Sequence, residues 1–213
     1  MKIYFDGCSM THGKGYLGED YKNLRWSKLL CNKIGAEEHN FSLSGGCNQR
    51  ILRNLSSTQE NYDLAVIQLT FPSRTEYYDG DKFKQINSHV TRNRDGSYHV
   101  HKKGMYGLSK QVRKKDNGGS SLFWETYFTR IYDDKYGIAI EEMVYNSVKS
   151  ICKARNMPLI MLSCFRTTKL LYDIMITPEN YDPVSETNRH PNINSQKLIA
   201  DDIYNLLYRS KHT

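Results

Sequence analysis

Hydrophobic residues recur along the chain with two periods, and these predict strands that alternate with helices. Lys2–Phe5, Asp63–Thr70 and Pro158–Cys164 are short apolar runs of strand length. The unbroken hydrophobicity of Asp63–Thr70 is typical of a strand buried on both faces of a parallel sheet. Trp26–Ile34 and Ile193–Leu207 instead carry apolar residues at helical spacing. This alternation predicts an α/β fold with a parallel sheet.

Weaker sequence patterns predict further elements between these strands and helices. His39–Leu43 is a candidate second strand, and a helix is expected from about Ile51. Helical patterning runs from about Leu122 to Arg155, with a break expected near Asp133–Gly137. Residues 165–189 are expected to be irregular. One domain of residues 1–213 accounts for all of these elements.

Residues 79–120 stand apart because they show no sustained period and are rich in glycine. We expect an insertion of loops there, with a hairpin around Asp95-Gly96. Residues 80–120 hold ten Lys and Arg against three Asp, so their net charge equals the +7 of the whole chain. Such a concentration of positive charge predicts an anionic partner, and the alternative is a solvated insertion without one.

The composition excludes several classes of protein. No run approaches 18 apolar residues, so no membrane span is expected. The first residues are too polar for a signal peptide. The five cysteines are scattered and form no CxxC pair, which argues against a zinc site and a disulfide framework. We therefore expect a cytoplasmic protein without a metal or other cofactor. The oligomeric state stays open.

Polar residues that can carry chemistry follow the predicted strands. Ser9 comes after the first strand, Arg74 comes after the Asp63–Thr70 strand, and His190 precedes the last helix. Active sites of parallel α/β sheets form at the carboxyl ends of the strands. Ser9 and His190 would form a nucleophile and general-base pair there.

At these positions the sequence resembles the SGNH (GDSL-like) hydrolase family. Its Gly-x-Ser motif after the first strand corresponds to Gly7-Cys8-Ser9, and its second block, an Asn followed by a Gly, corresponds to Asn40 to Gly45. Its His-Pro before the last helix corresponds to His190-Pro191. The resemblance implies a three-layer α/β/α, flavodoxin-like fold without metal or organic cofactor. It also implies that Ser9 is the nucleophile, that His190 is the base, and that the N–H groups of Ser9 and Gly45 bind the oxyanion.

Two residues of the family pattern are missing. The acid expected three residues before the histidine is Thr187, for which Asp182 or Glu186 could substitute, and a slow Ser–His dyad is the alternative. The oxyanion-binding Asn of the third block is also absent, and Asn48 is a candidate replacement. Arg74 could bind substrate, or it could pair with Glu76.

The predicted activity is hydrolysis of an O-acyl ester, such as an acetyl ester, of a carbohydrate or another polar metabolite. The sequence looks like a variant found among phage and bacterial SGNH-like proteins, so host cytoplasm or a virion is the expected location if the chain is viral. Two rival hypotheses stay open. One is a binding or structural module with altered catalysis. The other is a nucleic-acid-associated protein that uses the basic insertion.

Overall fold

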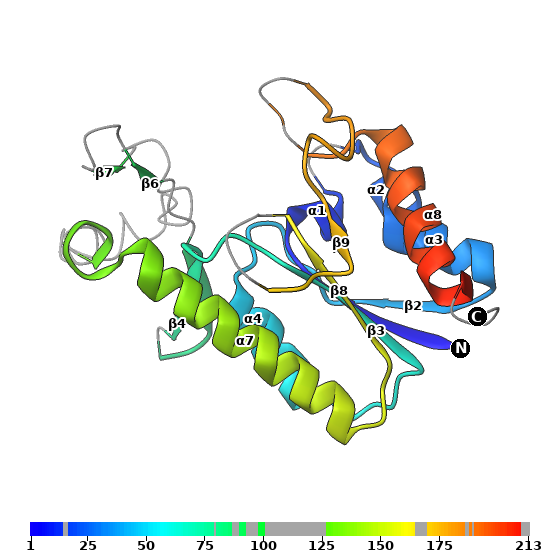
Figure 1. Ribbon diagram of the computed structural model, residues 1–213, viewed down its shortest axis with the longest axis horizontal. Coiled ribbons are helices and arrows are strands. Elements are labelled where there is room, and N and C mark those ends of the chain that lie inside the picture. The colour runs from blue at the N-terminus through cyan, green and yellow to red at the C-terminus, as the bar shows by residue number, and fades with distance from the viewer. Residues whose placement is uncertain are drawn as a thin grey trace.

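The centre of the molecule is a five-stranded parallel sheet (Figure 1). The computed structural model describes residues 1–14, 17–78, 80–86, 90–92, 98–100, 127–164, 170–185, 188 and 190–209. In spatial order the strands are β2 (Glu37–Asn40), β1 (Lys2–Asp6), β3 (Leu64–Leu69), β8 (Leu159–Ser163) and β9 (Ile174–Met175). Counted along the chain this is the order 2-1-3-4-5 of flavodoxin-like sheets.

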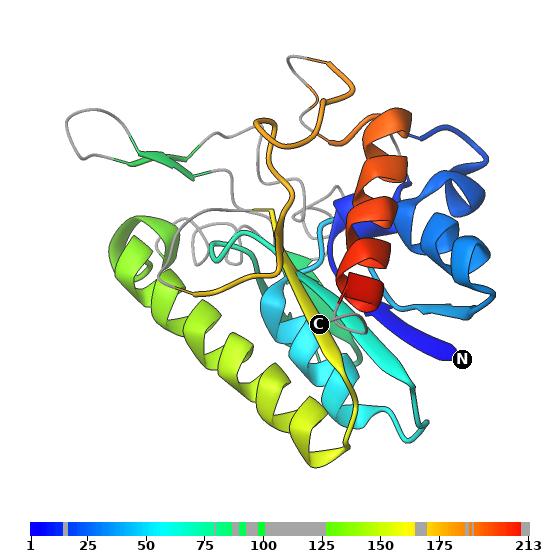
Figure 2. The ribbon, with the colours of Figure 1, turned by 45° about the vertical axis from the view of Figure 1, so that its right-hand side comes forward.

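Helices cover both faces of the sheet (Figures 1 and 2). α3 (Trp26–Ile34) and α8 (Ile193–Arg209) pack together on one face. α4 (Asn48–Ser57) and α7 (Asp134–Ala154) cover the other. The shorter elements are α1 (Ser9–His12), α2 (Tyr21–Leu24) and a π-helix at Tyr127–Ile131. The predicted three-layer α/β/α fold is confirmed.

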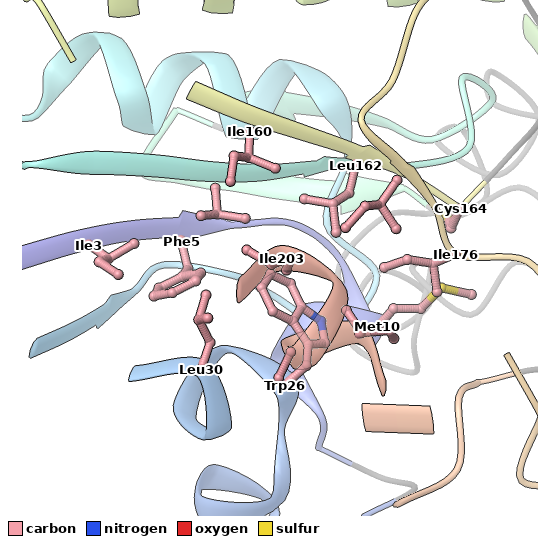
Figure 3. Close-up of a cluster of buried hydrophobic side chains, with 14 of the residues drawn as sticks. Ile3, Phe5, Met10, Trp26, Leu30, Ile160, Leu162, Cys164, Ile176 and Ile203 are labelled. Atoms are coloured by element: carbon pink, nitrogen blue, oxygen red, sulfur yellow. The ribbon is translucent and has the colours of Figure 1, made fainter. Parts of the chain in front are cut away.

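The side-chain alternation of the strands divides the core into two halves. Ile3 and Phe5 of β1 face α3 and α8, whereas Tyr4 between them packs in the cluster on the α4 and α7 side. Figure 3 shows Phe5 gathered with Trp26 and Ile203 in the first half, and all three side chains are 0% exposed. Burying both faces of β1 and β3 explains why these strands are nearly continuous in hydrophobicity.

Two helix boundaries follow directly from sequence signals. Gly35 ends α3 with a φ of 66°, the left-handed conformation that glycine adopts without strain. Asp133 caps α7, because its side chain accepts a hydrogen bond of 2.6 Å from the backbone N–H of Tyr136. The break expected near Asp133–Gly137 is therefore the start of α7.

The second strand was misplaced by the hydrophobic pattern. β2 covers Glu37–Asn40 rather than His39–Leu43. It is an edge strand with polar side chains, so apolar content could not mark it. The N–H of Glu37 donates to the carbonyl of Met1 at 2.9 Å, which aligns β2 with the start of β1.

Short strands also occur where the sequence predicts loops. β9 lies inside the 165–189 interval and is only two residues long, too short to show a period. β4 (Thr75–Tyr78) pairs with β5 (Phe83–Ile86), so this hairpin begins before residue 79. β6 (Val90–Arg92) pairs antiparallel with β7 (Tyr98–Val100) on either side of Asp95-Gly96, as that dipeptide predicts. Among the described residues, no helix has the length and hydrophobicity of a transmembrane segment.

Candidate active site

Ser9 is the first residue of α1 and follows β1 after a sharp turn at the carboxyl end of the sheet. Gly7 makes this turn possible. A Cβ at Gly7 would lie 2.4 Å from Thr11 Oγ1 and 3.0 Å from Gln68 Oε1, so a side chain does not fit. The turn leaves Ser9 8% exposed at the start of a helix.

His190 lies against Ser9 although 181 positions separate them in sequence. Ser9 Oγ is 2.7 Å from His190 Nε2. The loop leading into α8 passes over the end of the sheet that carries α1 (Figure 1). This loop folds back on itself, since the N–H of Val184 donates to the carbonyl of His190 at 2.8 Å and that of Asn192 donates to the carbonyl of Asp182 at 2.9 Å. The histidine is thus held by backbone hydrogen bonds.

Asn188 holds the other side of the imidazole ring. Its Oδ1 lies 2.6 Å from His190 Nδ1 and 3.3 Å from the backbone N of His190. A backbone N–H can only donate, so the amide atom facing it is the oxygen. That oxygen must then accept a hydrogen from Nδ1. Nε2 is consequently the bare nitrogen, and it can accept the Ser9 hydroxyl proton.

The sequence did not single out Asn188. The available signal was an amide side chain two residues before His190, near enough in sequence to reach the imidazole ring. Asp182 is exposed, and its carbonyl accepts hydrogen bonds from Asn192 and Ser195. Glu186 and Thr187 lie outside the described residues, so their predicted roles stay predictions.

Burial lowers the pKa of His190 below its usual 6.5 and outweighs the opposing effect of Cys8, while the positive charge of Arg74 adds a smaller effect in the lowering direction. The imidazole is therefore neutral at pH 7. A general base needs this state, because only the neutral ring can take a proton.

Two backbone N–H groups are candidates for binding an oxyanion. The N–H of Ser9 is at the first position of α1, where a helix provides no internal acceptor. Gly45 forms a turn with a φ of 77°. This turn is tied to the nucleophile loop, because the N–H of Leu43 donates to the carbonyl of Gly7 at 3.1 Å.

The side chain of Asn48, a candidate for binding the oxyanion, is hydrogen-bonded to the backbone of another residue. It is 1% exposed and makes two hydrogen bonds to the backbone of Thr70. Its Nδ2 donates to the Thr70 carbonyl at 3.0 Å, and its Oδ1 accepts from the Thr70 N–H at 2.8 Å. Asn48 therefore joins the start of α4 to the end of β3.

Solved structures have a fold similar to that of this chain. TesA superimposes with a TM-score of 0.54 over 98% of this chain and 99% of the TesA chain, at 13% identity. The chain has the SGNH-hydrolase fold. The esterase EstA from Pseudoalteromonas sp. gives a TM-score of 0.46 at 18% identity, over 100% of this chain and 99% of its own. The acetyl xylan esterase Est2A from Butyrivibrio proteoclasticus gives 0.39 at 14% identity, over 97% of this chain and 64% of its own. Comparison of sequences finds no matching family model and no matching curated protein.

Within the SGNH fold of this chain, a buried ion pair fixes the loop before Ser9. Asp6 and Arg50 form a close salt bridge, and both side chains are almost fully buried. Arg50 also donates to the carbonyls of Gly7 at 3.0 Å and of Phe41 at 2.8 Å. Burial raises the pKa of Asp6 to about 6 although Arg50 opposes the shift. The pair was not foreseen, since nothing in the spacing of Asp6 and Arg50 along the chain marks their contact.

Gln68 supports the same loop from the middle of the sheet. It is 0% exposed on β3, and its Oε1 accepts a hydrogen bond of 2.8 Å from Thr11 Oγ1. Its Nε2 lies 3.3 Å from Cys8 Sγ. A polar residue inside an apolar strand was the signal for such a role, because a buried amide needs hydrogen-bond partners.

Arg74 does not pair with Glu76. Glu76 instead accepts two hydrogen bonds from Arg53, at 3.0 and 2.9 Å, and a third from Gln85 at 2.8 Å. Arg74 Nη1 donates to Thr70 Oγ1 at 2.8 Å. Across the described residues, no group of three His, Cys, Asp or Glu side chains is arranged to hold a metal ion.

Proposed function

We propose that this chain is a serine esterase that hydrolyses an O-acyl ester, such as an acetyl ester, of a carbohydrate or another polar metabolite. The observation that carries the proposal is the 2.7 Å contact between Ser9 Oγ and His190 Nε2, in the tautomer that Asn188 selects. A hydroxyl held against a neutral imidazole at the carboxyl edge of the sheet is the arrangement that nucleophilic acyl transfer requires.

In the first step His190 takes the hydroxyl proton while Ser9 Oγ attacks the ester carbonyl. The N–H groups of Ser9 and Gly45 would donate to the oxygen that gains negative charge, and each such donor lowers the barrier by about 3 kcal/mol. His190 then returns the proton to the leaving alcohol. Water attacks the acyl-enzyme in the second step, with His190 again as the base.

Asn188 makes this centre different from a Ser-His-Asp triad. Replacing the triad Asp by Asn in the reference enzyme costs about 10⁴ in turnover, chiefly because the wrong tautomer results. Here the amide oxygen accepts from Nδ1, so the correct tautomer is present. What is missing is the negative charge that stabilises the imidazolium. We therefore propose a working but slow Ser–His–Asn centre.

The test compares Ser9→Ala with Ser56→Ala, a control at an exposed serine of α4. Hydrolysis of 4-nitrophenyl acetate should fall at least ~10³-fold in Ser9→Ala and stay unchanged in Ser56→Ala. A fluorophosphonate probe should label the wild type and the control but not Ser9→Ala. Equal turnover by purified, folded Ser9→Ala would refute Ser9 as the nucleophile.

The uncharged partner of His190 also favours the second candidate, a binding module that has lost catalysis. Experiments on the wild-type protein distinguish an esterase from a binding module. If fluorophosphonate does not label the folded wild type and no ester is turned over, the binding-module hypothesis is supported and the esterase proposal fails.

A further inference from the structure

Arg74 is held in a fixed position at the carboxyl end of β3. Its guanidinium lies 5.1 Å from the centre of the Phe71 ring, and its Nη1 donates to Thr70 Oγ1 at 2.8 Å. Thr70 is 0% exposed, and Asn48 holds both its backbone N–H and its carbonyl. The side chain is therefore anchored to a rigid part of the sheet edge.

The described residues provide no carboxylate for Arg74. The nearest acid in sequence, Glu76, is bound by Arg53 and Gln85. A guanidinium has five N–H donors in a planar fork, and only one of those on Arg74 is used by a protein atom in the described part of the chain. The remaining donors suit a carboxylate or a phosphate, which a guanidinium binds with two parallel hydrogen bonds.

A chain of contacts connects this cation with the nucleophile. Thr70 Oγ1, which accepts from Arg74, is 3.9 Å from Cys164 Sγ. Cys164 and Cys8 interact closely enough for each to shift the pKa of the other thiol, and Cys8 Sγ is 3.9 Å from Ser9 Oγ. Figure 3 shows Cys164 at the end of β8. The positive charge of Arg74 also lowers the pKa of His190, by less than Cys8 raises it.

We propose that Arg74 forms an anion subsite beside Ser9 and His190, and that the substrate is an ester carrying a carboxylate or phosphate near its scissile bond. This inference rests on the proposed esterase activity and specifies the substrate class. The anion fills the unused fork of Arg74, while the ester carbonyl lies at Ser9.

The subsite also acts on the base. A positive charge near His190 opposes formation of the imidazolium that catalysis requires. An anion bound to Arg74 offsets that charge, so a charged substrate increases the basicity of His190 in the complex. A neutral ester lacks this effect. Two neighbouring groups act on the pKa of His190 in opposite directions: Cys8 raises it, and Arg74 lowers it by a smaller amount.

The first experiment compares Arg74→Gln with Arg155→Gln. Arg155 donates to the carbonyls of Leu55 and Ser56 after the end of α7, so its substitution changes the net charge equally away from the site. The substrates are two anionic esters, 4-acetoxybenzoate and mono-4-nitrophenyl succinate, each with its neutral methyl ester. The first carries its charge on the alcohol part of the ester, and the second carries it on the acyl part.

For at least one pair, Arg74→Gln should lower the ratio of kcat/KM for the anionic ester to kcat/KM for the neutral ester by about 10- to 100-fold, which corresponds to the loss of a charge-assisted hydrogen bond. Arg155→Gln should change this ratio by no more than about twofold.

The second experiment measures pH profiles, because a merely structural role of Arg74 would not move them. The acid limb of kcat/KM reports His190 in the free enzyme, and that of kcat reports it in the complex. With the preferred anionic ester, the kcat limb should lie about half a pH unit above the kcat/KM limb, and with its methyl ester the two should coincide. In Arg74→Gln both limbs should move upward together.

Binding separates this inference from the esterase proposal. The wild type should bind 4-hydroxybenzoate more tightly than methyl 4-hydroxybenzoate, and Arg74→Gln should abolish the difference. If esters are hydrolysed through Ser9 but charge makes no difference to kcat/KM in the wild type, the subsite is overturned and the esterase proposal stands. If hydrolysis fails and the acid shows no preferential binding, both are overturned.

Discussion

At the scale of single residues, the chemistry depends on what the partner of His190 Nδ1 contributes. Asn188 supplies geometry without charge. The sequence identified Ser9 and His190 because each follows or precedes a strong structural element. It did not single out Asn188, since the family pattern places the acid one position earlier and no hydrophobic period covers residues 186–189.

Asn188 offers a test of this division between geometry and charge. Asn188→Asp should increase kcat about tenfold at pH 8, because a charge-assisted hydrogen bond stabilises the imidazolium more than a neutral one does. It should also move the acid limb of the profile to higher pH, since a nearby carboxylate raises the pKa of His190. Asn188→Ala should lower kcat about 10- to 100-fold through loss of orientation. These values come from steady-state kinetics with 4-nitrophenyl acetate.

Asp182→Asn and Glu186→Gln are the comparison variants. If Asn188 is the partner, both should retain activity within a few-fold. A loss above ~100-fold in either variant, with the fold intact, would instead show that a displaced carboxylate completes a triad. Asn188→Asp would then give no gain.

At the scale of elements, the β1–α1 turn determines where the nucleophile lies. β1, α3 and α8 were foreseeable because hydrophobic periodicity marks elements that are buried. Of the two supports of the turn, Gln68 carried a signal as a polar residue inside an apolar strand, whereas Arg50 carried none, because its partners come from distant elements. Sequence spacing carries little information on such contacts.

Gly7→Ala tests the turn. The backbone of Gly7 is outside the left-handed region, so an added Cβ is excluded by close contacts, 2.4 Å to Thr11 Oγ1 and 3.0 Å to Gln68 Oε1, and not by backbone strain. The variant should lose about 1–3 kcal/mol of unfolding free energy, the usual cost of overpacking. It should also lose most of kcat, because Ser9 moves relative to His190. Denaturant titration and kinetics measure the two effects.

Thr11→Ala is the control, since it loses the hydrogen bond to Gln68 without adding volume. It should cost less stability than Gly7→Ala and leave kcat within a few-fold. The double variant should recover part of the stability lost by Gly7→Ala. If Gly7→Ala is as stable and active as the wild type, the turn does not need a glycine.

At the scale of the whole molecule, the parallel sheet brings Ser9 and His190 together at one edge, and this was predictable from the order of the elements. The insertion at residues 79–120 stays a prediction, and the structure describes the β4–β5 hairpin at its start. The β4–β5 hairpin is attached to the start of α4, because the N–H of Cys47 donates to Gln85 Oε1 at 2.9 Å and Arg53 stacks on Phe83 at 4.1 Å. Cys47 follows the Gly45 turn by two residues, so Gln85, near the start of the basic segment, lies close to the candidate oxyanion site.

That attachment leads to a prediction on ionic strength. The charge of residues 80–120 should raise the local concentration of an anionic ester, and salt should weaken the effect because the Debye length shrinks to about 8 Å at physiological ionic strength. The kcat/KM for mono-4-nitrophenyl succinate should therefore fall with added salt more steeply than that for its methyl ester. Replacing Lys102, Lys103, Lys114 and Lys115 by Gln should flatten the difference. The same number of exposed lysines elsewhere, Lys135, Lys149, Lys153 and Lys197, serves as the charge-matched control.

Salt also distinguishes the basic segment from Arg74. A direct contact between Arg74 and a bound anion is short and partly buried, so it is screened much less than attraction over a Debye length. In high salt, the lysine variant should become indistinguishable from the wild type, while Arg74→Gln should keep most of its defect on the anionic ester. Identical salt responses for the anionic and neutral esters would refute electrostatic steering of the substrate by residues 80–120.

The basic segment could instead bind nucleic acid. Salt-sensitive binding of DNA or RNA that is lost in the lysine variant and retained in the control would support this role, because phosphate contacts made by lysine weaken steeply as salt rises.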